Sequence, residues 1–327
     1  MLKRLIPAVV LVAGLVAAGA LAQKRPEDVK AKEIVYEKEV AYRIFAAPEA
    51  VRAFAVQGNH LWYAIAKVLF YQPINAKQGQ QFRDMAGIPA TDISAIVIDG
   101  QGQVWVAAAG GVAVRKGNNF TAYTSANGLP EGAVHALAMG AHGDIWAGTE
   151  NGAARFAGGS WTKYTTAEGL PSNKVQALVG DSRGNMYIGT NKGLSVYDGS
   201  KFTNHNNKNT GSTGLDWNNI TVLAKEPGGD AIWMTDGPKN LNRFSNGKWE
   251  RFMEIHEGIT SIMNDGRWTW FGSPTGVLRF NGEEWVSDAA THGVVAQEIY
   301  AMFRDAEGRQ WFGMEKGVMM RENPVRR

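Results

Sequence analysis

The chain has 327 residues, 44% of them apolar, and its 34 basic and 31 acidic side chains leave a formal charge of only +3. Such a small and dispersed charge gives no basic footprint for nucleic acid, so nucleic-acid binding is excluded as a predicted function. Cysteine is absent, which excludes a disulfide framework, a thiol nucleophile and lipid attachment through a thiol.

The N-terminus carries the pattern of a secretory signal peptide. Lys3 and Arg4 precede an apolar run from Leu5 to Leu21, which ends in the small-x-small sequence Ala20-Leu21-Ala22. We predict that residues 1–22 are a signal peptide cleaved near Ala22, which makes the mature protein periplasmic or secreted. The alternative is an uncleaved segment that anchors the chain in the membrane. No second apolar stretch reaches spanning length, so no membrane span is expected in the mature chain.

Two further regions follow the signal peptide. Residues 23–41 are charged and poor in apolar side chains, as in the stretch KRPEDVKAKE, and are predicted to be a tether. Residues 42–327 are predicted to form one domain, because a chain of this length can bury a large core.

One sequence pattern about 41 residues long fills this domain seven times. An aromatic residue on the second predicted strand marks each copy, at intervals of 37 to 46 residues: Trp62, Trp105, Trp146, Tyr187, Trp233, Trp270 and Trp311. A fixed period of this size is typical of repeated supersecondary units that stack side by side.

The copy that begins at Val134 contains four predicted strands. In the first strand, Val134, Ala136 and Ala138 alternate with longer side chains, so these three residues are expected to share one face. The other strands follow with turn signals between them: residues 145–149, 153–156 and 161–164. Seven such antiparallel units predict an all-β fold, a seven-bladed β-propeller of four-stranded blades.

The last copy lacks its fourth strand. It runs from Ile299 through Trp311 to Met320 and stops at Arg327. Fourth strands elsewhere read aromatic-x-x-aromatic, and the segment Tyr42–Phe45, ahead of the first copy, has the same pattern. We predict that this N-terminal strand joins the last blade and closes the ring.

The linkers between copies also repeat. Five of them have a glycine six residues ahead of the first strand, followed by an apolar residue that can plug the space between blades, whereas the sixth copy has only Glu257-Gly258 before Ile259. These linkers are predicted to be scaffold: Gly87-Ile88-Pro89, Gly128-Leu129-Pro130, Gly169-Leu170-Pro171, Gly214-Leu215-Asp216 and Gly293-Val294-Val295.

Function is expected where the copies differ. The second residue of the predicted first strand is polar and varies, while its flanks barely change, so we predict that seven residues line one end of the ring: Arg52, Ser94, His135, Gln176, Thr221, Thr260 and Tyr300. Polar residues just ahead of the strands extend this set: Asp92, Asn173, Lys174, Asn218, Asn219, Gln297 and Glu298. The alternative is that these side chains satisfy backbone groups at strand starts and hold water.

Trp217 has no counterpart in the other copies. An exposed tryptophan beside amides such as Asn218 and Asn219 is a common contact for a sugar or a peptide, so Trp217 is predicted to bind a ligand. Packing over the fifth blade is the alternative.

The histidines give little sign of catalysis. They fall at different repeat positions without i, i+2 or i, i+4 spacing: His60, His135, His142, His205, His256 and His292. We therefore predict no metal site, no cofactor and no catalytic residue. The runner-up is a metal-dependent propeller lyase, with His135 or His292 facing the channel mouth.

Residues 181–194 carry a recognisable motif. The sequence Asp181-x-x-Gly184-x-Met186-Tyr187-Ile188-Gly189-Thr190-x-x-Gly193-Leu194 resembles the repeat of the two-component regulator propeller family. In that family the propellers are periplasmic sensor domains ahead of a transmembrane helix and a histidine kinase, and they sense carbohydrate or related ligands. The resemblance therefore implies an exported binding or sensing module.

The partner implied by this resemblance is a small, carbohydrate-like ligand or an envelope protein, with a sensor kinase as one candidate. No kinase or transmembrane segment follows the propeller in the sequence, so we expect the signal to pass to a separate protein. Two alternatives stay open, a lyase-like enzyme and a scaffold subunit of an envelope complex.

Overall fold

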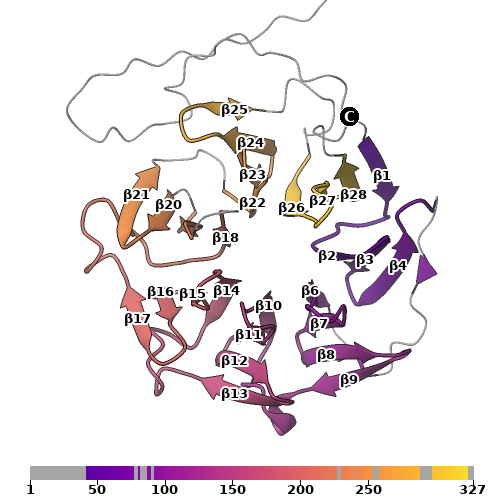
Figure 1. The fold of residues 1–327 in the computed structure, drawn as a ribbon, viewed down its shortest axis with the longest axis horizontal. Coiled ribbons are helices and arrows are strands. Elements are labelled where there is room, and N and C mark those ends of the chain that lie inside the picture. The colour runs from indigo at the N-terminus through magenta and orange to yellow at the C-terminus, as the bar shows by residue number, and fades with distance from the viewer. Residues whose placement is uncertain are drawn as a thin grey trace, which may run out of the picture.

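The computed structural model describes residues 42–76, 80–81, 87–89, 92–226, 230–238, 240–252, 258–287 and 297–322. These residues form seven four-stranded antiparallel sheets, arranged as blades around a ring (Figure 1). The predicted all-β, seven-bladed propeller is confirmed. The predicted signal peptide and tether lie outside the described residues, as do His256, His292 and the linker Gly293-Val294-Val295.

Blades 1 to 6 each take four consecutive strands, with the first strand innermost and the fourth at the rim (Figure 1). Blade 1 consists of β2 (Ala53–Gln57), β3 (His60–Ile65), β4 (Val68–Pro73) and β5 (Gln80–Gln81). Blade 2 consists of β6 (Ile93–Ile98), β7 (Val104–Ala108), β8 (Gly111–Lys116) and β9 (Asn119–Tyr123). Blade 3 consists of β10 (Val134–Met139), β11 (Ile145–Thr149), β12 (Gly152–Ala157) and β13 (Ser160–Tyr164). A 3-10 turn, η2 (Ser125–Asn127), lies between blades 2 and 3.

Blades 4 to 6 continue the same order. Blade 4 consists of β14 (Val175–Gly180), β15 (Met186–Thr190), β16 (Gly193–Tyr197) and β17 (Phe202–His205). Blade 5 consists of β18 (Leu223–Lys225), β19 (Ile232–Asp236), β20 (Asn240–Ser245) and β21 (Lys248–Phe252). Blade 6 consists of β22 (Ser261–Asn264), β23 (Thr269–Ser273), β24 (Gly276–Phe280) and β25 (Trp285–Ser287).

Blade 7 combines the two ends of the described chain. The strands β26 (Ile299–Arg304), β27 (Gln310–Met314) and β28 (Gly317–Arg321) are completed at the rim by β1 (Tyr42–Ala46). The register runs from Tyr42 opposite Arg321 to Ala46 opposite Gly317. The predicted closure of the ring by the N-terminal strand is therefore confirmed.

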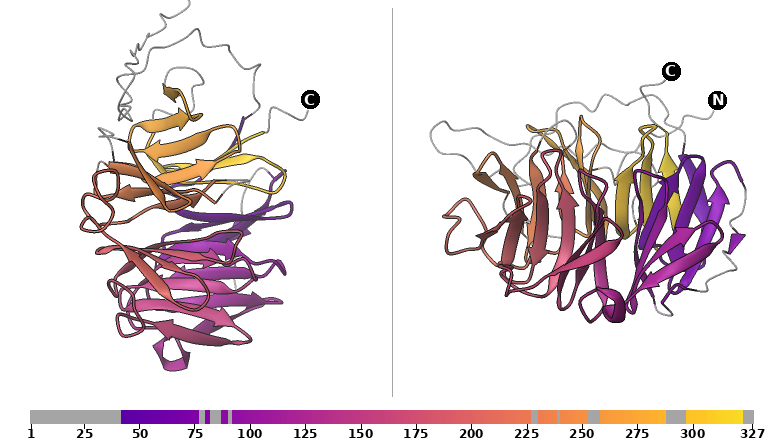
Figure 2. Two further views of the ribbon diagram at one scale, coloured as in Figure 1. Left: turned by 60° about the vertical axis from the view of Figure 1, so that its left-hand side comes forward. Right: turned by 60° about the horizontal axis from the view of Figure 1, so that its bottom comes forward.

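The strands run between the two broad sides of the ring, so that their ends collect on two faces (Figure 2). In blade 3 the first residue of β10, Val134, pairs with the last residue of β11, Thr149. Blade 4 repeats this pairing with Val175 and Thr190. The inter-blade linkers and the turns between second and third strands therefore share one face, which we name the linker face.

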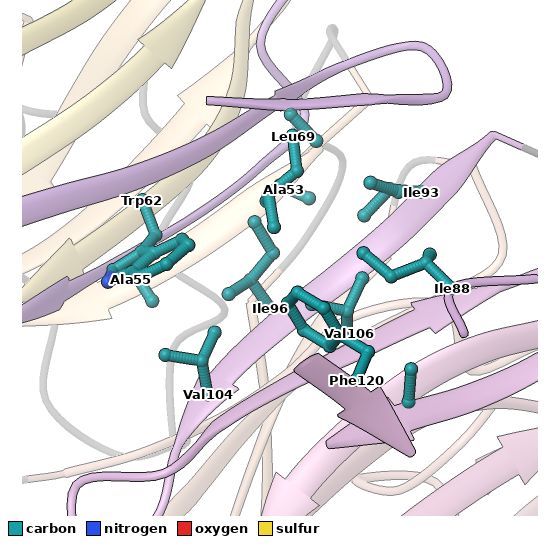
Figure 3. Close-up of a cluster of buried hydrophobic side chains, with 12 residues drawn as sticks. Ala53, Ala55, Trp62, Leu69, Ile88, Ile93, Ile96, Val104, Val106 and Phe120 are labelled. Carbon is teal, nitrogen blue, oxygen red and sulfur yellow. The ribbon is translucent and has the colours of Figure 1, made fainter. Parts of the chain in front are cut away.

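The hydrophobic core lies between the blades. Each of the seven blade interfaces has its own cluster of buried apolar side chains. Figure 3 shows the cluster between blades 1 and 2, where Trp62 and Leu69 lie opposite Ile93 and Ile96. Packing of this kind makes every blade depend on both of its neighbours.

A hydrogen bond also fixes the second-strand aromatic in every blade. The indole Nε1 of Trp311 donates to Asp305 Oδ2 at 2.7 Å. The corresponding pairs are Trp62 with Gln57, Trp105 with Asp99, Trp146 with Asp144, Tyr187 with Asp181, Trp233 with Glu226 and Trp270 with Asp265. Because an unpaired indole N–H in a core is costly, these acceptors belong to the scaffold.

His205 makes the stability of the blade 4–5 interface sensitive to pH. Its ring centre lies 5.2 Å from that of Phe244 and 5.5 Å from that of Trp249, and burial lowers the pKa of His205. The unfolded chain then binds a proton more readily than the folded chain. The contribution of His205 to the free energy of unfolding is therefore expected to be fully present above the unfolded pKa of about 6.5. It should decrease as the pH falls below that value.

Thermal melts across this pH range test that expectation. The substitution His205→Phe should reduce the fall in melting temperature on acidification, whereas His142→Gln, at an exposed histidine, should leave it unchanged. Identical pH profiles for the wild type and His205→Phe would contradict the assignment.

Candidate functional site

The seven variable residues lie on the linker face, around the innermost strands. Arg52, Ser94, His135 and Thr221 are exposed, and Gln176, Thr260 and Tyr300 are half-buried. Their flanking residues Val51, Val134, Val175, Ile220 and Ile299 are almost fully buried. An invariant apolar frame thus holds a variable polar position at the surface.

Four of these positions are β-bulges. The register shifts by one residue at Ser94, His135, Gln176 and Tyr300, in β6, β10, β14 and β26 respectively. A bulge leaves one residue unpaired and redirects its side chain. The other three positions, Arg52, Thr221 and Thr260, lie ahead of their strands, so the prediction that they are second strand residues is wrong for these blades.

The bulge also corrects the predicted alternation in β10. Val134 packs with Leu137 between blades 2 and 3, whereas Ala136 and Ala138 pack between blades 3 and 4. The expectation that Val134, Ala136 and Ala138 share one face is wrong, because the extra residue at His135 reverses the faces beyond it.

Several of the predicted site residues have structural partners. Ser94 Oγ donates to the carbonyl oxygen of Val134 at 2.6 Å, and Thr260 Oγ1 donates to that of Ile299, each on the following blade. Thr221 Oγ1 lies 2.9 Å from Thr235 Oγ1. These hydroxyls satisfy neighbouring polar groups, as the alternative interpretation expected.

Three predicted residues come together where the ring closes. The guanidinium carbon of Arg52 on blade 1 lies 4.2 Å from the centre of the Tyr300 ring on blade 7. The Tyr300 hydroxyl donates to Glu298 Oε2 at 2.7 Å, and this hydrogen bond raises the pKa of Tyr300. The cluster therefore presents a guanidinium, a phenol and a carboxylate on the linker face.

The remaining residues of the set are more separate. His135 Nε2 lies 3.5 Å from Glu150 Oε1 on the neighbouring turn. Gln176 Oε1 is buried and lacks a hydrogen-bond partner within the described part of the chain. Asn173 Oδ1 accepts from the backbone of Thr166 at 2.8 Å, while Lys174 and Gln297 are exposed.

Trp217, Asn218 and Asn219 lie on the loop between blades 4 and 5. The Trp217 side chain is 66% exposed, and the carbonyl oxygen of Asn219 accepts from Gly237 N at 2.9 Å. Asp236, which sequence reasoning missed, is completely buried beneath this loop. In blades 3 and 4 the same strand position is a threonine, so the change of residue type at Asp236 was the signal that could have identified it.

Two features are absent from the described residues. No helix among them is long and apolar enough to cross a membrane. No three His, Cys, Asp or Glu side chains gather there in a group that could hold a metal ion.

The comparisons with known proteins agree with the repeat pattern. The sequence model of the family described as "Two component regulator propeller" matches residues 169–192. A comparison with curated proteins found no match.

Solved structures share the fold at low sequence identity. The extracellular domain assigned to the hybrid two component system BT3049 of B. thetaiotaomicron has a TM-score of 0.71 at 16% identity, covering 86% of this chain and 41% of that one. The corresponding domain of BT4673 from the same organism gives 0.68 at 18% identity, with 86% and 40% covered. Virginiamycin B lyase from Staphylococcus aureus gives 0.70 at 16% identity, with 86% and 99% covered.

These similarities establish the architecture. The chain spans about two fifths of the length of the two extracellular domains and nearly the whole length of the lyase. Because identities this low show the fold alone, the repeat match carries the more specific information. The chain therefore contains a two component regulator propeller repeat within a seven-bladed β-propeller.

Proposed function

We propose that this protein is an exported binding or sensing module that recognises a small, carbohydrate-like ligand or a partner protein through its linker face. The observation that carries the proposal is the variable polar position at the start of the innermost strands, held in a repeated apolar frame. Scaffold positions repeat because each blade must pack against two neighbours. A position that varies within that frame is free to serve recognition.

Hydrogen bonding narrows the set of recognition residues. Ser94 and Thr260 are occupied with the backbone of the next blade. Arg52, Tyr300 and Glu298 form a cluster with donors and acceptors on the linker face. We therefore propose this cluster as the principal contact, extended by His135 and Lys174.

Export is part of the proposal. The N-terminal pattern of residues 1–22 supports a signal peptide, and the two B. thetaiotaomicron domains with this fold are extracellular. After cleavage, the removal of Lys3 and Arg4 would leave a formal charge of +1. The module would then act in the periplasm or outside the cell and pass its signal to an envelope protein.

Ligand binding can be tested by thermal shift with a panel of neutral and acidic oligosaccharides, followed by calorimetric titration. Arg52→Ala should weaken binding of the best ligand by about 10- to 100-fold, because a hydrogen bond to a charged group contributes about 1.5–3 kcal/mol. Ser94→Ala, in the same ring but bonded to the backbone, should leave the affinity unchanged. If no oligosaccharide raises the melting temperature, or if both variants bind like the wild type, the proposed site is wrong.

An enzyme is the second candidate. The lyase with this fold and the pairing of His135 with Glu150 on the linker face favour it. A stoichiometric divalent metal in the purified protein would support the lyase. Co-purification with an envelope protein, without any ligand-induced thermal shift, would instead support a scaffold subunit.

A further inference from the structure

Trp217 is unlike the other tryptophans of the chain. It is 66% exposed, whereas the remaining ten are buried or half-buried. It lies between β17 and β18, and no other copy has an aromatic residue at this place in its linker. An exposed tryptophan on a rigid element is typical of a binding hot spot.

The backbone beneath Trp217 is held firmly. The amide of Trp217 donates to both carboxylate oxygens of Asp236, at 3.0 and 2.9 Å, and the amide of Asp216 donates to the same group. The indole lies against Gly237, where a Cβ atom would come within 2.9 Å of Trp217 Cγ. The ring is therefore organised before any partner arrives, which reduces the entropy cost of binding.

The side-chain amides of Asn207 and Asn218 beside Trp217 already have hydrogen-bond partners. Asn207 N donates to Asn218 Oδ1 at 2.6 Å, and Asn218 Nδ2 donates to Asn207 Oδ1 at 3.0 Å. Asn207 Nδ2 donates in turn to the carbonyl oxygen of Asp216 at 3.1 Å. A sugar needs amide groups that can bond its hydroxyls, so these internal bonds disfavour a sugar as the occupant.

The charge beside Trp217 favours a cation. The side chain of Asp216 is 47% exposed, and its carboxylate is shared by Arg251 at 2.9 Å and Asn240 at 3.4 Å. With Asp236 below, the network around Trp217 holds two carboxylates and one guanidinium. Lys208 on the same loop is exposed, so solvent screens its charge.

Elsewhere the chain stacks an arginine on an aromatic ring beside a carboxylate. The guanidinium carbon of Arg309 lies 5.7 Å from the centre of the Trp311 ring, and Arg309 Nε also donates to Asp305. Arg243 repeats this arrangement, because its guanidinium carbon lies 6.0 Å from the centre of the Trp233 ring and its Nε donates to Glu226 Oε1. Trp217 and Asp216 offer the aromatic ring and the carboxylate of this arrangement at the surface.

We propose that Trp217 and Asp216 form a docking point for an arginine side chain of a partner protein. The guanidinium stacks on the exposed indole and bonds to the open side of the Asp216 carboxylate. This contact goes beyond the ligand site proposed above, because it uses none of the residues at the ring closure. It gives the propeller a separate means of holding the protein to which it reports.

The docking point can be tested by NMR of the eleven indole N–H groups, with the Trp217 signal assigned by its loss in Trp217→Phe. The probes are three blocked tripeptides, acetyl-Gly-X-Gly-amide with X as arginine, lysine or leucine. The arginine peptide should shift the Trp217 signal and leave the other ten in place. Asp216→Asn should weaken its binding by about two- to fivefold, as expected for an exposed cation–π and carboxylate contact.

Asp198→Asn is the matched control, because Asp198 is exposed and lies in the turn between β16 and β17, at the strand ends opposite to the linker face. It should leave the titration unchanged, and melting curves should show that all variants are folded. An equal shift with the leucine peptide, a shift with an oligosaccharide, or no shift of the Trp217 signal with the arginine peptide would overturn the proposal. None of these results would affect the oligosaccharide test of Arg52, so the two proposals can fail separately.

Discussion

Phe45→Ala is expected to lower the melting temperature by about 6–10 °C, and deletion of residues 42–46 by more. Phe45 is 6% exposed and stacks on Trp311, with ring centres 5.7 Å apart. Removing a buried phenylalanine costs about 3–5 kcal/mol, and a domain of this size loses about 2 °C for each kcal/mol. Deletion of β1 also exposes the backbone edge of β28, along which five residue pairs are lost. Melting followed by circular dichroism measures both effects.

The neighbouring residue supplies the control. Ile44 lies on the same strand but is 65% exposed, so Ile44→Ala should cost less than about 0.5 kcal/mol. If the Phe45→Ala and Ile44→Ala variants had the same melting temperature, the N-terminal strand would not close the ring in solution. A much larger effect of Phe45→Ala would show that the closure contributes to the stability of the whole domain.

The fold could be predicted because the same local signals occur in every blade. The second-strand aromatic gave the number of blades, and the aromatic pair in Tyr42–Phe45 identified the missing strand. A signal that recurs seven times is insensitive to an error in any one copy. The closure followed from a packing requirement, because blade 7 needs a fourth strand to cover Trp311.

The bulges could not be predicted from one strand. In β10 the residues Val134 to Met139 read as a regular alternation, and only the pairing with β11 shows that His135 is an extra residue. A bulge depends on which residue of the partner strand lies opposite, and that register is a tertiary property. For the same reason the strand starts near Arg52, Thr221 and Thr260 were misplaced.

The positions of the candidate site residues could be predicted from the repeat, but which of these residues contact one another depends on how the ring closes. Arg52 and Tyr300 are far apart in the sequence and meet because blade 7 packs against blade 1. Asp236 was missed because its role, binding the amides of the Trp217 loop, depends on a contact across the linker face. Residue type alone marked the position as different without showing its partner.

Asp144→Ala is expected to destabilise the protein by about 2–5 kcal/mol, or roughly 4–10 °C in melting temperature. Asp144 Oδ2 accepts from Trp146 Nε1 at 2.6 Å and from Arg155 Nε at 2.7 Å. Removal of the carboxylate leaves a buried indole N–H without its acceptor and separates Arg155 from its counter-charge. Asp198→Ala, at an exposed turn, should lower the melting temperature much less and serves as the control.

Blade 3 also allows a rescue experiment, because it obtains the same hydrogen bond from a different sequence position. Blade 4 uses Asp181, six residues ahead of Tyr187, whereas the corresponding residue of blade 3 is Gly140. A Cβ atom at Gly140 would lie 2.4 Å from Asp144 Oδ1, so the Asp144 carboxylate occupies the space that a side chain at Gly140 would fill. Gly140→Asp alone should therefore destabilise the blade by crowding and like-charge repulsion.

The double variant Gly140→Asp/Asp144→Asn reproduces the arrangement of blade 4, where Asn185 Nδ2 donates to Asp181 Oδ2 at 2.6 Å. It should be more stable than either single variant, Gly140→Asp or Asp144→Asn, giving a strongly non-additive mutant cycle. Additive losses would show that blade 3 requires the aspartate at position 144 itself. Recovery would show that the scaffold requires a carboxylate at one point in space, which different copies of the repeat can supply from different positions in the sequence.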